Sequence, residues 1–457
     1  MPPLRPTRLL PPPGTTGRGH LLRVVRRGLR RPPRRDQPWP AVVLMCAGLL
    51  MAVCTGPAGA APSPASAAAT VAAPDAARAV WLPHASAPAP GVVAVPGTDR
   101  RGVGTLMGIP EGVTAGVAVF DRVTGDFTEL HEADRPFRAA SVVKLLLALD
   151  YLWDRGPVYD VPQADRDRLR AMLSRSDDAA ASHYWATGGG SAVITRMVPR
   201  LGLTGTVPPP TAYPGHWGYT ATTAADTVRV YRHLLDEAPP PVRDLVLGAL
   251  RQYTRCAADG FDQHFGLPSA FEAPGTVKQG WSGFTSGGCG AGESPAGGSS
   301  TAPGTVTGTA APANATALDL TSDALHTTGT VGPDDRTVVA VLTLHPDGTP
   351  YGTAYSKVTA LTGSLHVPGS VSPSGTRFAT WGSGVRVRAA ATTSATALTT
   401  LPAGVHVLVG CQKQGGTVSV PPYVNDWWAY LPQYGGWVTN IYISSPGDTL
   451  PGVPPCP

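Results

Sequence analysis

The chain has 457 residues, enough for two or three domains, and its apolar content of 42% is ordinary for a globular protein. The formal charge of +5 arises at the N-terminus, because residues 1–60 contain ten arginines and one acidic side chain, Asp36. The rest of the chain has 26 basic and 30 acidic side chains, a balance of about −4 that argues against a nucleic-acid partner.

The first 60 residues predict a signal peptide. An arginine-rich stretch is followed by an apolar run at 41–54 and by Ala58-Gly59-Ala60, which suits signal peptidase. The apolar run of 14 residues is shorter than a bilayer span, so we expect no stable membrane span; a retained anchor is the alternative. Arg26-Arg27 leaves the twin-arginine and Sec routes both open. We therefore expect a secreted, extracellular protein, with cell-wall association as a further expectation.

Composition and hydropathy divide the mature chain into four segments. Residues 61–108 are rich in Ala and Pro and predict a disordered linker, because they cannot bury enough apolar surface to fold. Residues 109–367 predict an α+β domain, residues 368–384 a second linker, and residues 385–457 a small all-β domain.

In chain order, the α+β segment predicts strands, then helices, then strands and a last helix, which suits an antiparallel sheet flanked by helices. The expected strands are 116–120, 127–131, 275–281, 324–331 and 336–345. The expected helices are 141–151, 165–173, 177–187, 191–201, 223–235, 242–251 and 353–364. A Gly/Ser/Thr/Ala stretch at about 286–316 predicts a disordered surface insertion. The all-β segment predicts short strands at 385–388, 404–409, 427–431 and 436–443.

Export would leave four cysteines in an oxidising compartment, which favours disulfides. Of the three possible connectivities, Cys256 with Cys289 and Cys411 with Cys456 keeps each bridge inside one predicted domain, and we expect this pairing; free thiols are the alternative. None of these cysteines has C-x-x-C spacing, and we expect no metal and no cofactor.

The helix predicted at 141–151 is apolar on nearly every face, which indicates burial. Lys144 follows Ser141 by three residues, so the two side chains share one face. A desolvated lysine loses its proton near neutral pH and can then accept the proton of a serine hydroxyl that attacks a carbonyl. The alternative is that Ser141 caps the helix and Lys144 reaches out to solvent.

Two later motifs strengthen the catalytic interpretation. Ser176-Asp177-Asp178 begins a predicted helix, where the alternative is that Ser176 is simply the N-cap. Lys278-Gln279-Gly280 lies late in a predicted strand, where a glycine lets a ligand approach the backbone. The three motifs in this order are more specific than any one of them alone.

On these motifs, residues 113–366 resemble the superfamily of serine β-lactamases and penicillin-binding D,D-peptidases, and are most similar to class A β-lactamase-like serine hydrolases. The stretches that carry the resemblance are 137–145, 172–180 and 277–281.

The resemblance implies roles for individual residues. Ser141 would attack an amide carbonyl and form an acyl-enzyme, with Lys144 as the base. Ser176 would relay a proton to the leaving nitrogen, and Lys278 would supply positive charge for a substrate carboxylate. The backbone amides of Ser141 and Trp281 would form the oxyanion hole, and Asp178, Gln279 and Gly280 would border the substrate.

Three positions depart from the family pattern. Asp178 stands where the family usually has an Asn that donates a hydrogen bond to substrate, and an ionised Asp cannot donate one. Gln279 replaces the usual hydroxyl residue. No glutamate occurs between Glu132 and Glu237, where class A β-lactamases supply the glutamate for deacylation.

Other polar and aromatic residues give weaker signals. We expect the histidines to serve in loops or packing, because they lack metal-site spacing; they are His183, His216, His233 and His264. Tyr213, His216 and Trp217 either line the mouth of the cleft or pack locally under a Pro-rich loop.

The all-β segment resembles a bacterial SH3-type barrel, through Val385-Arg-Val-Arg388, Leu401-Pro-Ala-Gly404, Trp427-Trp428 and Gly436-Trp437-Val438. The resemblance implies a cell-wall ligand; the alternative is that Trp428 and Trp437 fill a small core.

Together these observations predict a secreted, monomeric serine hydrolase acting on β-lactams, on D-alanyl peptides or on other amide or ester bonds of the envelope. The alternative is a catalytically silent cell-wall-binding protein that retains the β-lactamase fold.

Overall fold

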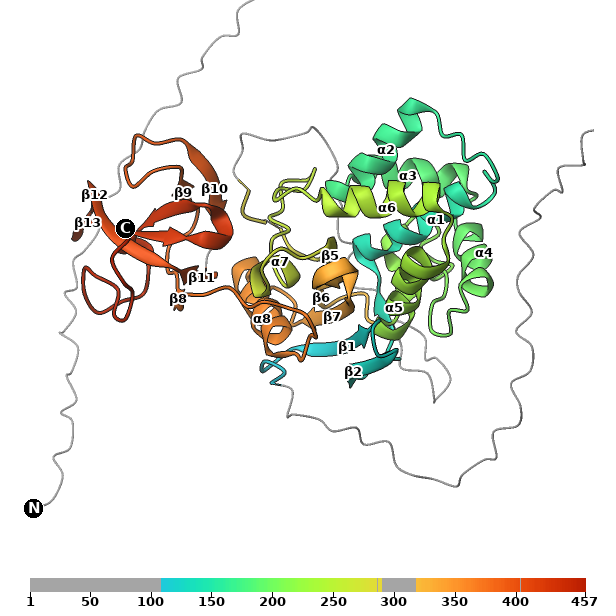
Figure 1. The fold of residues 1–457 in the computed structure, drawn as a ribbon, viewed down its shortest axis with the longest axis horizontal. Coiled ribbons are helices and arrows are strands. Elements are labelled where there is room, and N and C mark those ends of the chain that lie inside the picture. Colours follow the sequence, from blue (N-terminus) through green and yellow to red (C-terminus); the bar gives the residue numbers. More distant parts are fainter. Residues whose placement is uncertain (1–107, 286, 290–317, 403) are drawn as a thin grey trace, which may run out of the picture. The chain divides into compact units, whose positions relative to one another are not determined.

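The computed structural model describes residues 108–285, 287–289, 318–402 and 404–457 (Figure 1). The predicted signal peptide, the first linker up to residue 107 and most of the insertion at 286–316 lie outside the described residues. All described residues belong to one compact unit. Within these described ranges, no helix combines the length and the apolar character needed to cross a membrane.

The α+β part is built on a five-stranded antiparallel sheet in the order β2-β1-β7-β6-β5. Its strands match the predicted ones within a few residues: β1 (Thr114–Asp121), β2 (Asp126–His131), β5 (Thr276–Ser282), β6 (Asp323–Val331) and β7 (Thr337–His345). Because β2 and β5 are the edge strands, one side of β5 is left for the segment that carries Ser141.

Both faces of this sheet are covered, and the side chains of β1 show why. Ala118 and Phe120 face a core shared with the helices α1 to α6, whereas Val117 and Val119 face a second core that includes α7 and α8. Successive strand residues point to opposite faces, so an unbroken apolar strand fits a sheet buried on both sides. Figure 1 shows the helical layers on either side of the sheet.

The helices predicted from the sequence are present with small differences at their ends. They are α1 (Lys144–Trp153), α2 (Gln163–Ser174), α3 (Asp178–Thr187), α4 (Ala192–Arg200), α5 (Ala224–Arg232), α6 (Pro240–Arg251) and α8 (Tyr351–Ser364). The first of them is preceded by a 3-10 turn, η1 (Ala140–Val143), and α5 continues into a π-helical turn, η3 (His233–Glu237). The short helix α7 (Leu267–Ala270) was not predicted.

A pair of very short strands sets the approach to η1. β3 (Phe137–Arg138) pairs with β4 (Ala221–Thr222), and the N–H of Ala139 donates to the carbonyl of Thr220 across 2.7 Å. Two-residue strands leave no periodic pattern, so they could not be predicted from the sequence. They tie the segment before Ser141 to the segment that contains η2 (Trp217–Tyr219).

The C-terminal part is all β, as predicted. A five-stranded sheet has the order β10-β9-β14-β13-β12, and β11 pairs with β8 in a separate ribbon. The strands are β8 (Thr376–Ala379), β9 (Val385–Arg388), β10 (Ala397–Leu401), β11 (His406–Val409), β12 (Cys411–Val420), β13 (Tyr423–Leu431) and β14 (Gly436–Thr439). This hydrogen-bonded order of the described strands does not close into a barrel, so the SH3-type barrel stays a prediction.

Two side chains of this part bear on its stability. Trp428 is 1% exposed and fills the core, as expected for at least one of the two tryptophans. Cys411 and Cys456 form a disulfide that ties the last residues of the chain to β12.

Candidate active site

Ser141 and Lys144 lie together at the junction of η1 and α1. The Nζ of Lys144 is 2.8 Å from the Oγ of Ser141, and the exposed fractions of the two residues are 0% and 5%. Ser141 makes no capping hydrogen bond, and Lys144 does not reach solvent. The alternative of a capping serine and a solvent-seeking lysine is therefore wrong.

Ser176 reaches the same lysine from the turn before α3. Its Oγ lies 3.1 Å from the Nζ of Lys144, and its carbonyl oxygen accepts a hydrogen bond from that Nζ across 2.7 Å. Asp177 is the N-cap of α3, because its carboxylate accepts the N–H of Ala180 at 2.8 Å. The alternative role of Ser176 as the cap is thus wrong, and its hydroxyl is available to the two lysines.

Lys278 completes the cluster from β5. Its Nζ lies 2.9 Å from the Oγ of Ser176 and donates to the carbonyl of Gln279 at 3.0 Å. The structure therefore brings Ser141, Lys144, Ser176 and Lys278 into one chain of hydrogen bonds, although Ser176 and Lys278 are 102 positions apart in the sequence.

The backbone around these residues is constrained. Ala140 and Ser176 both have positive φ values, 44° and 56°, which non-glycine residues adopt at a cost of about 1–3 kcal/mol. At Gly280, an added Cβ would lie 3.2 Å from the carbonyl oxygen of Ala139 and 3.3 Å from the amide nitrogen of Ser141. Only a strand without a side chain at this position can lie so close to the serine.

Burial governs the charge state of both lysines. Burial lowers the pKa of Lys144, and the neighbouring Asp178 acts in the opposite direction without cancelling the effect. Burial also lowers the pKa of Lys278 well below its ordinary value, and the charge of Lys144 lowers it further. A neutral amine beside a serine hydroxyl is able to accept its proton.

Asp178 pairs with Lys144 from the start of α3. Its Oδ1 forms an ion pair with the Nζ of Lys144 at 2.6 Å, and its side chain is 49% exposed. The carboxylate therefore stabilises the charged form of Lys144 from a position that solvent can reach.

The side chain of Gln279, expected near a substrate carboxylate, points elsewhere. Its Nε2 donates to the carbonyl oxygens of Gln263 and Phe265, at 3.0 and 2.6 Å. The side chain is 1% exposed, so its amide ties β5 to the preceding loop.

Two residues at the site were missed or left open by the sequence. The ring of Trp217 lies 4.8 Å from the Nζ of Lys144, which places this tryptophan at the site. Tyr213 and His216 instead pack against Tyr219. Asp259 accepts a hydrogen bond from the indole N–H of Trp281 at 2.9 Å and is electrostatically coupled to both lysines. An Asp-Gly turn was the only sequence signal at this position.

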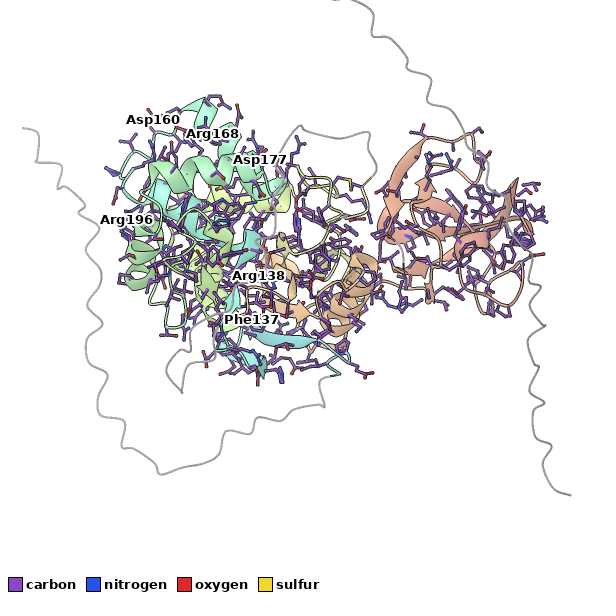
Figure 2. All side chains as sticks on the ribbon, turned by 180° about the vertical axis from the view of Figure 1, so that it is seen from behind. Phe137, Arg138, Asp160, Arg168, Asp177 and Arg196 are labelled. Carbon is purple, nitrogen blue, oxygen red and sulfur yellow. A yellow bond between two sulfur atoms is a disulfide. The ribbon has the colours of Figure 1, made fainter. Side chains whose placement is uncertain are left out.

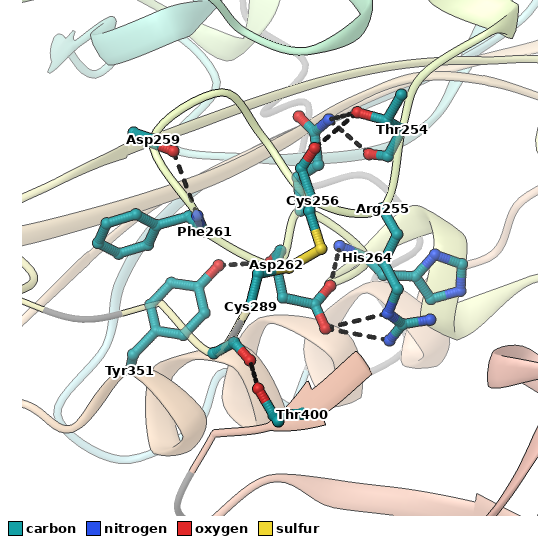
Figure 3. Close-up of a disulfide and its surroundings, with 12 residues drawn as sticks. Thr254, Arg255, Cys256, Asp259, Phe261, Asp262, His264, Cys289, Tyr351 and Thr400 are labelled. Atoms are coloured by element: carbon teal, nitrogen blue, oxygen red, sulfur yellow. Dashed lines mark hydrogen bonds and ion pairs between the residues drawn. A yellow bond between two sulfur atoms is a disulfide. The ribbon is translucent and has the colours of Figure 1, made fainter. Parts of the chain in front are cut away.

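The loop that carries Asp259 is fastened on both sides (Figure 3). Cys256 and Cys289 form a disulfide, and the buried carboxylate of Asp262 accepts hydrogen bonds from Arg255. The N–H of Phe261 donates to Asp259 at 3.2 Å. The position of Asp259 is therefore held by covalent and polar links rather than by a helix or strand.

Phe137 and Arg138, labelled in Figure 2, are both buried just before the nucleophile. Arg138 donates to the carbonyl oxygens of Ser282 and Ser322, and its own carbonyl is bonded to His326 at 2.8 Å. These bonds join the segment before Ser141 to the ends of β5 and β6.

The four histidines expected to pack or to lie in loops do have such neighbours. His183 contacts Tyr184, His216 stacks on Tyr219, His233 stacks on Trp153 and His264 lies against Tyr253. Among the residues with described positions, no group of three or more His, Cys, Asp or Glu could hold a metal ion.

No family model matches the chain. The chain is 37% identical over 210 residues to LppW, a candidate lipoprotein, of Mycobacterium tuberculosis (strain H37Rv) and of Mycobacterium bovis. The match covers 45% of this chain and 65% of the relative, so the chain spans less than two thirds of the curated relatives it matches.

Solved structures with low sequence identity match more than half of the chain. PBP-A is 16% identical with a TM-score of 0.39, over 57% of this chain and 91% of that one. A class A β-lactamase from Mycobacterium abscessus is 19% identical with a TM-score of 0.37, over 55% and 92%. The β-lactamase of Streptomyces albus G is 20% identical with a TM-score of 0.36, over 56% and 95%.

Proposed function

We propose that the chain is a secreted serine hydrolase that forms an acyl-enzyme through Ser141, on β-lactams, D-alanyl peptides or other amide or ester bonds of the cell envelope. The single observation that carries this proposal is the 2.8 Å contact between the Oγ of Ser141 and the buried Nζ of Lys144. A buried amine with a lowered pKa beside a hydroxyl has the chemistry of an activated nucleophile.

In the proposed reaction, the Oγ of Ser141 attacks the carbonyl carbon while Lys144 takes the hydroxyl proton. Ser176, within reach of both lysines, passes a proton to the leaving group. The amides of Ser141 and Trp281 are proposed to stabilise the oxyanion, a contribution of about 3 kcal/mol per donor in other enzymes. Water then releases the acyl group.

Acylation of Ser141 is the direct test. The full chain is incubated separately with a fluorescent penicillin and with a neutral phenylacetyl thioester, and intact mass identifies any adduct. We expect an adduct with at least one probe, absent in Ser141→Ala and retained in Ser364→Ala, whose hydroxyl bonds the carbonyl of Leu361 at the end of α8. The absence of any adduct on Ser141, together with no release of thiol from the thioester, would contradict the proposal.

A catalytically silent cell-wall-binding protein is the second candidate, and the Asp178–Lys144 ion pair favours it. A carboxylate at 2.6 Å stabilises the protonated lysine, which cannot act as a base. Binding to purified peptidoglycan by the full chain, together with an unreactive Ser141, would support this candidate. Sedimentation of the full chain with purified peptidoglycan measures this binding, and it also tests the proposed cell-wall contact of the C-terminal part.

A further inference from the structure

Charge at the mouth of the site differs from charge in its interior. Asp178 is half-exposed, and its Oδ1 pairs with the Nζ of Lys144 at 2.6 Å. Asp259 is exposed, and its carboxylate accepts the indole N–H of Trp281 at 2.9 Å. Partial desolvation raises the pKa of this carboxyl, and the hydrogen bonds from Phe261 and Trp281 oppose that rise. In their ionised forms, both accessible side chains present negative charge to an incoming substrate.

The positive charges of the site are covered by protein. Lys144 and Lys278 are 0% and 1% exposed. The Nζ of Lys278 is bonded to the hydroxyl of Ser176 and to the carbonyl of Gln279, at 2.9 and 3.0 Å. Burial lowers the pKa of both lysines, so each ammonium loses its proton more readily than that of an exposed lysine. An ammonium that is both buried and bonded to protein acceptors is poorly placed to hold a substrate carboxylate.

The charges that act on Lys278 show the same balance. Lys144 lowers its pKa, whereas Asp178 and Asp259 raise it. The two carboxylates are thus close enough to the centre of the site to act on its buried cations. With either lysine neutral, the negative charges outnumber the positive ones in this group of four.

Two other groups that could bind an anion are engaged elsewhere. The amide N–H groups of Gln279 donate to Gln263 and Phe265. Arg255, on the same loop as Asp259, is paired with the buried Asp262 at 3.1 Å. Neither side chain is free to offset the carboxylates of Asp178 and Asp259.

Two aromatic rings at the site also favour a cationic ligand over an anionic one. The ring of Trp217 lies 4.8 Å from the Nζ of Lys144, and the indole of Trp281 is fixed by Asp259. Indole faces attract cations through the ring quadrupole and give no such attraction to carboxylates.

We propose that the substrate of Ser141 carries an amine or quaternary ammonium group next to the scissile bond, and that Asp259 and Asp178 select it over substrates with a carboxylate there. This inference rests on the proposed function, because it concerns the substrate class of the same site. In the reaction the C–S or C–N bond to the leaving group breaks as the ester bond to the Oγ of Ser141 forms, and the serine proton passes through Lys144 to the leaving group.

Three phenylacetyl thioesters that differ only in their leaving group test the proposal. The leaving groups are thiocholine, β-mercaptopropionamide and β-mercaptopropionate, which are cationic, neutral and anionic. Thiol release by the full chain gives kcat/KM for each, corrected for spontaneous hydrolysis and for the thiols of the enzyme. We expect the order cationic, neutral, anionic, with about tenfold or more between the extremes at low salt and a smaller ratio as salt screens the carboxylates.

Asp259→Asn separates the charge of this residue from its contacts. Its amide oxygen can still accept the indole N–H of Trp281, so the loop keeps its anchor. We expect the cationic-to-anionic ratio to fall severalfold. Asp126→Asn is the matched control, because Asp126 is an exposed acid on β2, at the opposite edge of the sheet from β5, and we expect an unchanged ratio.

The outcomes distinguish the two proposals. Equal rates for the three thioesters, or a preference for the anionic one, would overturn the inference and leave the serine hydrolase intact. No thiol release and no adduct on Ser141 with any thioester or with penicillin would overturn the proposed function itself. A cationic preference that persists in Asp259→Asn would remove Asp259 from the assignment.

Discussion

The carboxylate of Asp178 lies 2.6 Å from the Nζ of Lys144, in an ion pair that joins a fully buried lysine to a half-exposed acid. Two opposing effects therefore act on the protonation of Lys144. Burial disfavours the charged amine, whereas the carboxylate favours it. The balance lowers the pKa of Lys144, and Asp178 limits how far.

Asp178→Asn is expected to move the pH dependence of acylation. Removing the carboxylate removes an interaction that raises the pKa of Lys144, so that pKa falls further. The neutral base then forms at lower pH, and the acidic limb of the profile of kcat/KM shifts to lower pH. The profile of the neutral thioester, measured for the wild type and the variant, checks this. A shift to higher pH would contradict the assignment of Lys144 as the base.

Lys144→Arg is expected to lower acylation of Ser141 by about 10²–10⁴-fold, the usual contribution of a general base. Arginine keeps the positive charge but stays protonated, so it cannot take the serine proton. Rapid-quench mass analysis of the Ser141 adduct measures the loss. Lys357→Arg is the control, because this lysine lies on α8 and donates to the carbonyl of Glu111. Thermal unfolding of each variant shows whether the fold is kept.

Gly280→Ala is expected to impair acylation more than stability. The new Cβ would lie 3.2 Å from the carbonyl of Ala139 and 3.3 Å from the amide of Ser141, closer than ordinary packing. Strand β5 must then move by a few tenths of an ångström away from the nucleophile. The second-order rate of adduct formation and the midpoint of urea unfolding, measured together, separate the two effects. Equal losses in both would point to a purely structural role for this glycine.

Much of the site was predictable because its residues lie in elements with regular periodicity. Ser141 and Lys144 are one helical turn apart, and a helix that is apolar on nearly every face is predicted to be buried. Asp259 gave no comparable signal. Its position at the site depends on the Cys256–Cys289 disulfide and on the indole of Trp281, and both are contacts between residues far apart in the sequence.

The fold shows the same division. Long strands such as β7 and long helices such as α2 were predicted within a few residues. β3 and β4 have two residues each, too few for any pattern, and they form because Phe137 and Ala221 are buried in a core that the sequence does not display. The side chain of Gln279 was expected to border the substrate but instead donates to the carbonyl oxygens of Gln263 and Phe265, partners that only the folded loop brings near it.

His326 is expected to make the fold sensitive to acid. Its Nδ1 accepts the N–H of Thr343, its Nε2 bonds the carbonyl of Arg138, and burial lowers its pKa from 6.5 to about 4. The unfolded chain therefore binds a proton between these values that the folded chain excludes, so stability is present above about pH 6.5 and is lost as the pH falls toward 4.

From this residue alone, the free energy of unfolding should fall by about 2 kcal/mol between pH 7 and pH 5. Urea unfolding at the two pH values checks the figure. The variant His326→Gln should show a smaller difference between them, whatever its stability at pH 7. His345, whose pKa burial also lowers to about 4, adds a contribution of the same sign that the variant keeps.

The Cys411–Cys456 disulfide is expected to stabilise the C-terminal part by about 3–4 kcal/mol, because it closes a loop of 45 residues in the unfolded chain. The double variant Cys411→Ser/Cys456→Ser should therefore unfold this part at lower urea concentration. Fluorescence of the buried Trp428 follows the transition. Mild reduction of the wild type is the control, and it should reproduce the shift.

Two adjacent residues directly before α3 have separate roles. Asp177 is the N-cap of the helix, and the hydroxyl of Ser176 contacts the two lysines. A saturation library over both positions, sorted once for expression and once for adduct formation, would therefore split cleanly. Changes at 177 would deplete the first pool, and small replacements of Ser176, which is 2% exposed, only the second. Such neighbours let a laboratory, or evolution, silence the chemistry of this chain without dismantling its architecture.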